Sequence, residues 1–162
     1  MIHFLQIGHM KVCLGGTFDV LHDGHKRLIT TACDLAGPSG TVVIGISKGR
    51  LTSKQRTIAS YQQRRKAIEA FLSQLPRTPQ VILTPIQDKY GPSIEEAFDA
   101  IVVSPETKPV AEEINEQRKQ QGKKPLHITV VPYVLAKDGR PISSTRIRNG
   151  EIDDQGTLLK KE

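Results

Sequence analysis

Short apolar runs that alternate with helical patterns constrain this chain more than any other feature. Each run is rich in β-branched residues and shows no alternation of apolar and polar positions; the runs are 12–14, 41–46, 81–83, 100–103 and 127–131. A strand that is apolar at successive positions has both faces buried, which is typical of parallel sheets. The helical segments between the runs supply the crossovers that parallel strands need. The pattern predicts an α/β fold, with a doubly wound parallel sheet of five strands and helices on both faces.

Five helices are expected around these strands. The first begins near two histidines and runs to Ala36, and the second follows Ser60 and ends before Pro76. Ser93 is expected to cap a short third helix that has acidic residues in its first turn. The fourth is a mostly polar helix at 107–121, and the last begins at Ser143 and stops at Gly150. The organisation therefore predicts one continuous domain.

The length of 162 residues fits a single domain with a real core. We expect this domain at 11–150, an N-terminal extension at 1–10 and a polar C-terminal tail at 151–162 that frays. The first nine residues are too short for a signal peptide and lack its charged start. No apolar run approaches the roughly 20 residues of a membrane span. The sequence indicates no membrane partner and says nothing of oligomeric state.

Cysteine usage and charge limit the location and the ligands. Cys13 and Cys33 fall in the first strand and the first helix, which favours buried thiols in a reducing, cytoplasmic compartment over a disulfide. The net charge of +6 suits anionic ligands such as nucleotides, and leaves a nucleic-acid-binding module as one alternative. With 4% aromatic residues and no Trp, a stacking platform for single strands is poorly supported.

The residues that bear the chemistry begin with Gly-Gly-Thr-Phe-Asp-Val-Leu-His-Asp-Gly-His at 15–25, between the first strand and the first helix. A helix start offers free backbone N–H groups and a partial positive charge, which suit phosphate. His22 and His25 lie three residues apart, so both can face one anion, while Gly24 leaves room for a base or ribose. Two imidazoles at a phosphate suit charge stabilisation in the transition state. Zinc is the rival ligand, but no Cys or Glu stands at ligand spacing.

A second phosphate motif stands at 142–148, Ile-Ser-Ser-Thr-Arg-Ile-Arg. An ordinary N-cap needs one hydroxyl, whereas Ser143, Ser144 and Thr145 supply three. Arg146 and Arg148 lie near the positive end of the helix dipole, which is unfavourable unless an anion neutralises them. That conflict points to a polyphosphate.

These two motifs resemble the Gly-Thr-Phe-Asp, His-x-Gly-His and Ile-Ser-Ser-Thr-x-Ile-Arg signatures of the nucleotidyltransferase superfamily. The resemblance covers about residues 11–150 and implies a Rossmann-like sheet. The string at 15–28 is similar to one family in particular, the archaeal and eukaryotic type of phosphopantetheine adenylyltransferase. That family implies a reaction of ATP with 4′-phosphopantetheine that gives dephospho-coenzyme A and pyrophosphate, with Mg²⁺ bridging the ATP phosphates. No protein ligand of the metal can be named.

The resemblance also assigns roles to residues. Thr17, His22 and His25 form the implied catalytic set. The implied ATP-binding set, including the β- and γ-phosphate ligands of the second motif, is Gly15, Thr17, Phe18, His22, Gly24, His25, Ser143, Ser144, Thr145 and Arg148. Lys54 is implied to reach phosphates and Arg64 to hold the acceptor. Asp19 is interpreted as a turn carboxylate outside the catalytic set.

Sister activities share the same motifs. One is a cytidylyltransferase acting on a small phosphoalcohol, and another is an FMN adenylyltransferase. Asp23 and the Ser-Pro-Glu-Thr segment at 104–107 favour the phosphopantetheine family. The segment 88–92 resembles the loop that this family places near the acceptor.

Overall fold

The computed structural model describes residues 9–52 and 58–159. Its centre is one five-stranded sheet in the order β3-β2-β1-β4-β5, in which every adjacent pair is parallel. The strands are β1 (Lys11–Gly16), β2 (Thr41–Ser47), β3 (Gln80–Ile86), β4 (Ala100–Val103) and β5 (His127–Val130). The predicted α/β class and the five parallel strands are confirmed.

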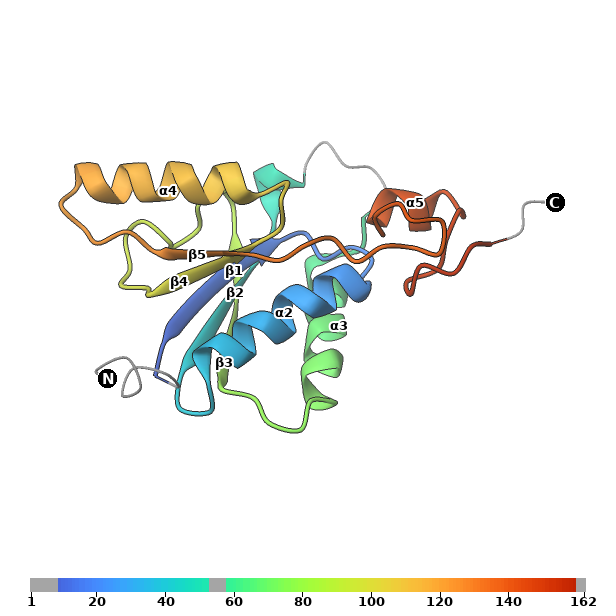
Figure 1. Cartoon of the computed structure of the whole chain (residues 1–162), viewed down its shortest axis with the longest axis horizontal. Helices are drawn as coiled ribbons and strands as arrows, with labels where there is room; N and C mark the ends of the chain where they lie inside the picture. Colours follow the sequence, from blue (N-terminus) through green and yellow to red (C-terminus); the bar gives the residue numbers. More distant parts are fainter. Residues whose placement is uncertain (1–8, 53–57, 160–162) are drawn as a thin grey trace.

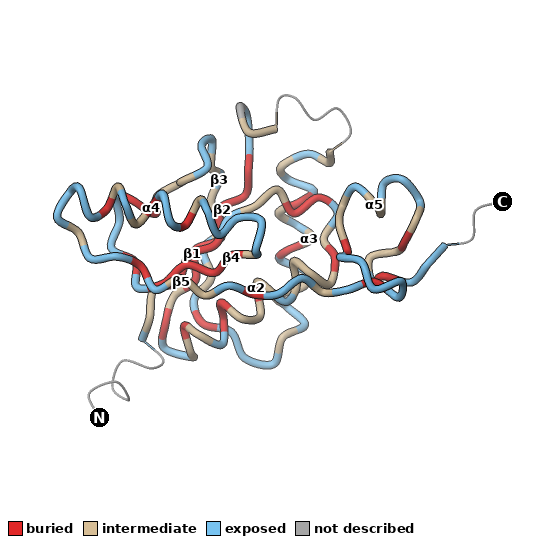
Figure 2. The backbone as a smooth tube through the Cα atoms, turned by 45° about the horizontal axis from the view of Figure 1, so that its top comes forward, coloured by how far each residue is buried: buried red, intermediate tan, exposed pale blue. Residues whose placement is uncertain are grey.

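Helices cover both faces of the sheet because successive strand residues point to opposite sides. Val12 and Leu14 pack into one core with α2 (Asp23–Ala36) and α3 (Tyr61–Ser73). Cys13 packs into the other core, with α4 (Lys108–Gln120). Figure 1 shows α2 and α3 on one side of the strands and α4 on the other. Figure 2 shows the buried residues concentrated in the central strands.

The strand order reverses at β1, which pairs with β2 on one side and with β4 on the other. The loops after β1 and β4 therefore leave in different directions. In open parallel sheets a crevice forms at such a switch point, beyond the carboxyl ends of the strands, and ligands bind there. The first motif follows β1, so the topology places it at this crevice.

Gly15 and Gly16 were expected in the turn between the first strand and the first helix. Instead they are the last residues of β1, paired with Gly45 and Ile46 of β2. A Cβ on Gly45 would come within 2.8 Å of the Ile86 side chain, and one on Gly15 within 3.3 Å. The absence of side chains at these two positions makes room for Ile86 and leaves space at the end of the sheet.

The short helix expected after Ser93 is wrong, because residues 89–95 form turns. The Ser93 hydroxyl donates to the carbonyl of Tyr90 and is therefore not available as a cap for the residues that follow. The buried guanidinium of Arg118 in α4 donates to the carbonyls of Ser93 and Glu96 at 2.9 and 3.0 Å. Carbonyls that a helix would bond internally are thus taken by another element.

The chain after β5 forms a small lobe beyond the sheet, which contains α5 (Ser144–Arg148) (Figure 1). Its core is Ala136, Ile142 and Ile152. The expectation that the tail frays is wrong for 151–159, since Ile152 is fully buried and pairs with Leu158. Most of the expected N-terminal extension, 1–8, lies outside the described residues, as does 160–162.

Cys13 and Cys33 are free and buried, as predicted. Among the residues that the structure describes, no helix is both long and apolar enough to cross a membrane.

Candidate active site

The two histidines build the start of α2. His22 is the N-cap residue, and its Nδ1 accepts from the N–H groups of Gly24 at 3.0 Å and His25 at 3.4 Å. The His25 Nδ1 accepts in return from the N–H of His22 at 3.3 Å. This reciprocal capping box satisfies backbone donors that the helix leaves unpaired. It also stacks the two rings, with centroids 3.7 Å apart and planes 22° from parallel.

This geometry fixes the tautomer of both rings. A nitrogen that accepts a hydrogen bond carries no proton, so each neutral imidazole holds its proton on Nε2. Burial lowers the pKa of His22 to about 4, against an opposing effect of Asp154. Burial also lowers the pKa of His25 to about 3, and the adjacent His22 lowers it further. Near neutral pH the helix start therefore presents two neutral Nε2–H donors.

The predicted role of Gly24, to leave room for a base or ribose, stays a prediction, and the structure adds a second reason for the glycine. A Cβ at this position would lie 2.8 Å from Cε1 and 3.0 Å from Nδ1 of His22. The glycine is needed so that the His22 ring can fold back over the first turn. Phe18 is also held tightly: it is buried, has a φ of 54°, and lies 5.3 Å from the His25 ring centroid. A non-glycine residue at positive φ is strained and persists where its surroundings require it.

Thr17 directly follows β1 and is oriented by a residue at the end of β2. The Ser47 hydroxyl donates to Thr17 Oγ1 at 3.0 Å, which leaves the Thr17 hydroxyl hydrogen free for a ligand. Arg64 of α3 is buried and donates to the carbonyls of Thr17 at 3.0 Å and Ser47 at 2.8 Å. Its Nε donates to the carbonyl of Ala59 at 2.9 Å. Arg64 thus joins three segments at the carboxyl ends of the strands.

Asp19 links the two motifs. Arg148 donates from Nη1 to the Asp19 carboxylate at 3.1 Å, and the N–H of Ala59 donates to the same side chain at 3.0 Å. Asp19 is buried, whereas a third of the Arg148 side chain is exposed. Asp19 therefore orients an arginine that can still reach a ligand. Arg146 is instead turned towards the lobe, where it pairs with Asp138.

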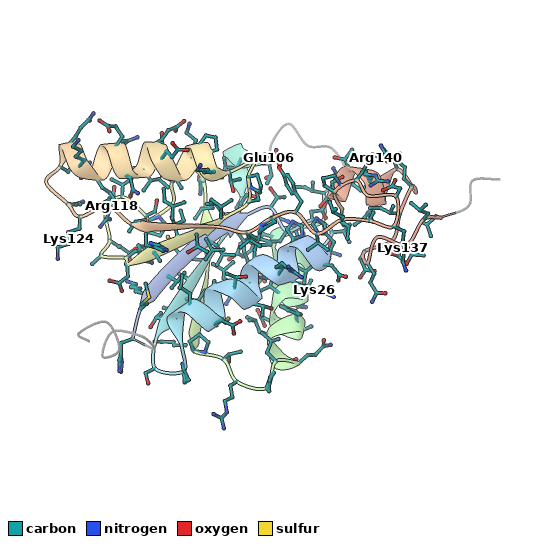
Figure 3. All side chains as sticks on the ribbon, viewed as in Figure 1. Lys26, Glu106, Arg118, Lys124, Lys137 and Arg140 are labelled. Atoms are coloured by element: carbon teal, nitrogen blue, oxygen red, sulfur yellow. The ribbon has the colours of Figure 1, made fainter. Side chains whose placement is uncertain are left out.

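One cavity of about 580 Å³ brings the motifs together at the switch point. Its walls contain all the residues implied to bind ATP, which are Gly15, Thr17, Phe18, His22, Gly24, His25, Ser143, Ser144, Thr145 and Arg148. Ser143 caps α5, with its hydroxyl accepting from the N–H of Arg146 at 3.2 Å. Glu106 also lines the cavity, and Figure 3 shows it at the N-terminal end of α4, with Arg140 out on the lobe.

A second, smaller cavity of about 220 Å³ adjoins the first, and Gly15, Gly16, Thr17 and Thr107 line both. It lies between the sheet and α4, over the strand glycines, and its other walls are mainly apolar. Tyr90 and Lys89 of the loop after β3 line it as well. The pair of cavities offers a site for a polar, phosphorylated ligand beside a slot for a less polar chain.

Two more residues, Lys54 and Arg64, were predicted to bind ligands. Lys54 falls outside the described residues, and Arg64 lines neither cavity, so both ligand-binding roles stay predictions. Ser47 is not among the predicted site residues, although it orients Thr17, and the turn carboxylate predicted at Asp19 is bonded to Arg148. The sequence signal for Ser47 is its place as a polar residue directly after the apolar run at 41–46. No signal in the sequence connects Asp19 with a residue in α5.

The parallel sheet, the paired histidines at a helix start and the hydroxyl-rich α5 at the same cavity define a nucleotidyltransferase. Residues 13–150 match a family model described as cytidylyltransferase-like. Phosphopantetheine adenylyltransferase of Methanosarcina mazei is 49% identical over 152 residues, which cover 93% of this chain and 98% of the relative. The enzyme of the same name from Methanopyrus kandleri is 44% identical over 147 residues, 89% of this chain and 91% of the relative.

A solved structure of a protein with unknown function from Archaeoglobus fulgidus is also similar. It is 34% identical, with a TM-score of 0.65, over 75% of this chain and 89% of that one. The chain belongs to the cytidylyltransferase-like family and, within it, to the phosphopantetheine adenylyltransferases. The family resemblance that the motifs carried is confirmed.

Proposed function

We propose that the protein transfers the adenylyl group of ATP to 4′-phosphopantetheine, giving dephospho-coenzyme A and pyrophosphate. The observation that carries the proposal is the meeting of both phosphate motifs at one cavity beside a smaller, mainly apolar one. The larger cavity suits the nucleotide and its phosphates. The smaller one suits the uncharged pantetheine arm, with the acceptor's phosphate near Thr17, where the two cavities join. The names of the archaeal relatives support the same substrate pair.

The proposed chemistry needs alignment and charge stabilisation, and no general base. A phosphate oxygen of the acceptor, already ionised at neutral pH, attacks the α-phosphorus, and the bond to the β-phosphate breaks as pyrophosphate leaves. Thr17 and His25 donate to the α-phosphate, where charge builds up in the transition state. His22 and the segment from Ser143 to Arg148 hold the triphosphate and the departing pyrophosphate. The capping box prepares the two imidazoles for this task, because it fixes their Nε2–H donors before substrate arrives.

Mg²⁺ enters this proposal as part of the nucleotide substrate. Among the described residues no group of three or more His, Cys, Asp or Glu side chains is arranged to hold a metal. Asp19, a buried carboxylate of the cavity wall, is already bonded to Arg148 and to the Ala59 N–H. The ATP phosphates are thus the main ligands that the proposal gives the ion, in keeping with the preference of Mg²⁺ for substrate phosphates.

The proposal places the reaction in the cytoplasm. Burial raises the pKa of Cys13 to about 12 and that of Cys33 to about 11, so both stay protonated thiols. Two unpaired buried thiols suit a reducing compartment.

The test is pyrophosphate release by the purified protein with Mg²⁺. ATP and CTP are each paired with 4′-phosphopantetheine, FMN and glycerol 3-phosphate. We expect pyrophosphate release only with the pair ATP and 4′-phosphopantetheine. Release with CTP and glycerol 3-phosphate, or with ATP and FMN, would refute the proposed substrates and assign the chain to one of the sister activities.

A further inference from the structure

The segment 151–159 lies beyond the residues that match the family model, 13–150, and yet contacts the catalytic end of α2. The N–H of Asp23, the first residue of α2, donates to the backbone carbonyl of Asp154 at 3.0 Å. The first N–H groups of a helix have no partner within it. Here the His22 ring takes the N–H groups of Gly24 and His25, and the tail takes that of Asp23. The start of the catalytic helix is therefore completed by the tail.

The segment is firmly built. Ile152 is fully buried against Ala136 and Ile142. The Asp153 carboxylate accepts from the N–H groups of Gln155 at 2.9 Å and Thr157 at 2.8 Å, which closes a turn. Gly156 has a φ of 83°, and a Cβ there would lie 2.8 Å from the Ala136 Cα. Because the segment is held rigidly, it can fix the position of the residues that it contacts.

The same segment is bonded to the second phosphate motif. The N–H of Glu151 donates to the carbonyl of Arg146 at 3.0 Å, and the Glu151 carboxylate lies 3.6 Å from Arg146 Nε. Since Arg146 belongs to α5, the tail joins the helix that carries the hydroxyl groups to the helix that carries the histidines. Figure 1 shows the lobe beside the end of α2 where the histidines lie.

We propose that residues 151–159 are part of the active-site framework, and that this segment, through the backbone carbonyl of Asp154, holds His22 and the start of α2 in register with α5. The expected effect on turnover rests on the proposed adenylyl transfer. The positioning of His22 does not depend on which reaction the protein catalyses.

Three variants test the proposal. Ile152→Ala removes the buried side chain that anchors the segment, Gly156→Ala places a Cβ 2.8 Å from the Ala136 Cα, and Asp34→Asn is the control. Asp34 is an exposed carboxylate at the far end of α2. Each protein is measured for kcat, for the KM of ATP, and for the imidazole ¹⁵N shifts of His22 in the absence of substrate.

We expect kcat to fall about tenfold in Ile152→Ala and several-fold in Gly156→Ala, with little change in KM, because a small misalignment acts mainly on the transition state. The His22 shifts should change in Ile152→Ala and in Gly156→Ala and not in the control. If Ile152→Ala does not fold, Ile152→Val replaces it. Wild-type kcat, or lost kcat with unchanged His22 shifts, would overturn the proposal. The shifts are read without acceptor, so they remain informative even if 4′-phosphopantetheine is not the substrate.

Discussion

Replacing Gly24 with Ala separates two opposite expectations. Helix propensity alone predicts that Ala in place of Gly stabilises a helix by roughly 1 kcal/mol. The structure predicts the reverse, because the new Cβ would lie 2.8 Å from Cε1 and 3.0 Å from Nδ1 of His22. To regain an ordinary van der Waals contact the ring must move by roughly half an ångström. That movement weakens the capping box, and loss of a cap costs about 1 kcal/mol.

The same displacement should lower turnover. A misplacement of about 1 Å can reduce catalysis ~100-fold, so we expect Gly24→Ala to lose between ~10-fold and ~100-fold in kcat. Thermal unfolding and pyrophosphate release measure the two effects. A double-mutant cycle with His22→Ala supplies the control, because Gly24→Ala should no longer destabilise a protein that lacks the ring. A more stable Gly24→Ala protein with wild-type kcat would refute this account of the glycine.

Four further results are expected. His25→Ala should lower kcat by at least ~100-fold with little change in the KM of ATP, and equal losses in ATP binding and turnover would show that His25 is structural. Asp19→Asn should raise the KM of ATP about tenfold, since Arg148 loses the carboxylate that orients it. Steady-state assays measure this KM, and an unchanged value would refute the role given to Asp19. His22 and His25 have folded-state pKa values of about 4 and about 3, below the ordinary 6.5, so the unfolded chain binds more protons and the free energy of unfolding should fall as the pH drops from 6.5 towards 3. Urea titrations near pH 7 and pH 5 measure that slope, and a flat profile contradicts it. Chelation of Mg²⁺ by EDTA should stop pyrophosphate release, and release that continues would mean that the nucleotide reacts without the ion.

The sheet could be predicted because its signal is local. A strand buried on both faces is apolar at successive positions, and β2, with the sequence Thr-Val-Val-Ile-Gly-Ile-Ser, shows this directly. The helix expected at Ser93 failed for the opposite reason. The carbonyls of Ser93 and Glu96 accept hydrogen bonds from Arg118 in α4, and no pattern in the sequence around Ser93 indicates that contact. The apolar run at 81–83 is shorter than β3, which extends through Pro85 to Ile86. Proline is tolerated there because β3 is an edge strand.

The motifs predicted which residues meet at the larger cavity, and they predicted less of how those residues are held in place. The spacing of His22 and His25 was enough to place both rings on one side of a helix start. The positioning contacts cross the chain, from Ser47 to Thr17, from Asp19 to Arg148 and from Asp154 to Asp23. Such contacts depend on the strand order and on the path of the lobe. They leave no periodic pattern in the sequence.

The charges that line the larger cavity bear on the role proposed for Mg²⁺. The whole chain has a net charge of +6, yet the described side chains that line the larger cavity include one arginine, Arg148, together with Asp19 and Glu106. The two imidazoles are neutral, because burial lowers the pKa of each well below 7. The described wall therefore offers directed hydrogen-bond donors with little net positive charge. Donors of this kind favour the charge distribution of the transition state over tight binding of a bare triphosphate. In the proposed reaction, neutralisation of the triphosphate therefore falls largely to the Mg²⁺ bound to the nucleotide, and the proposed part of the protein is to hold the transferred phosphate between His25 and Thr17.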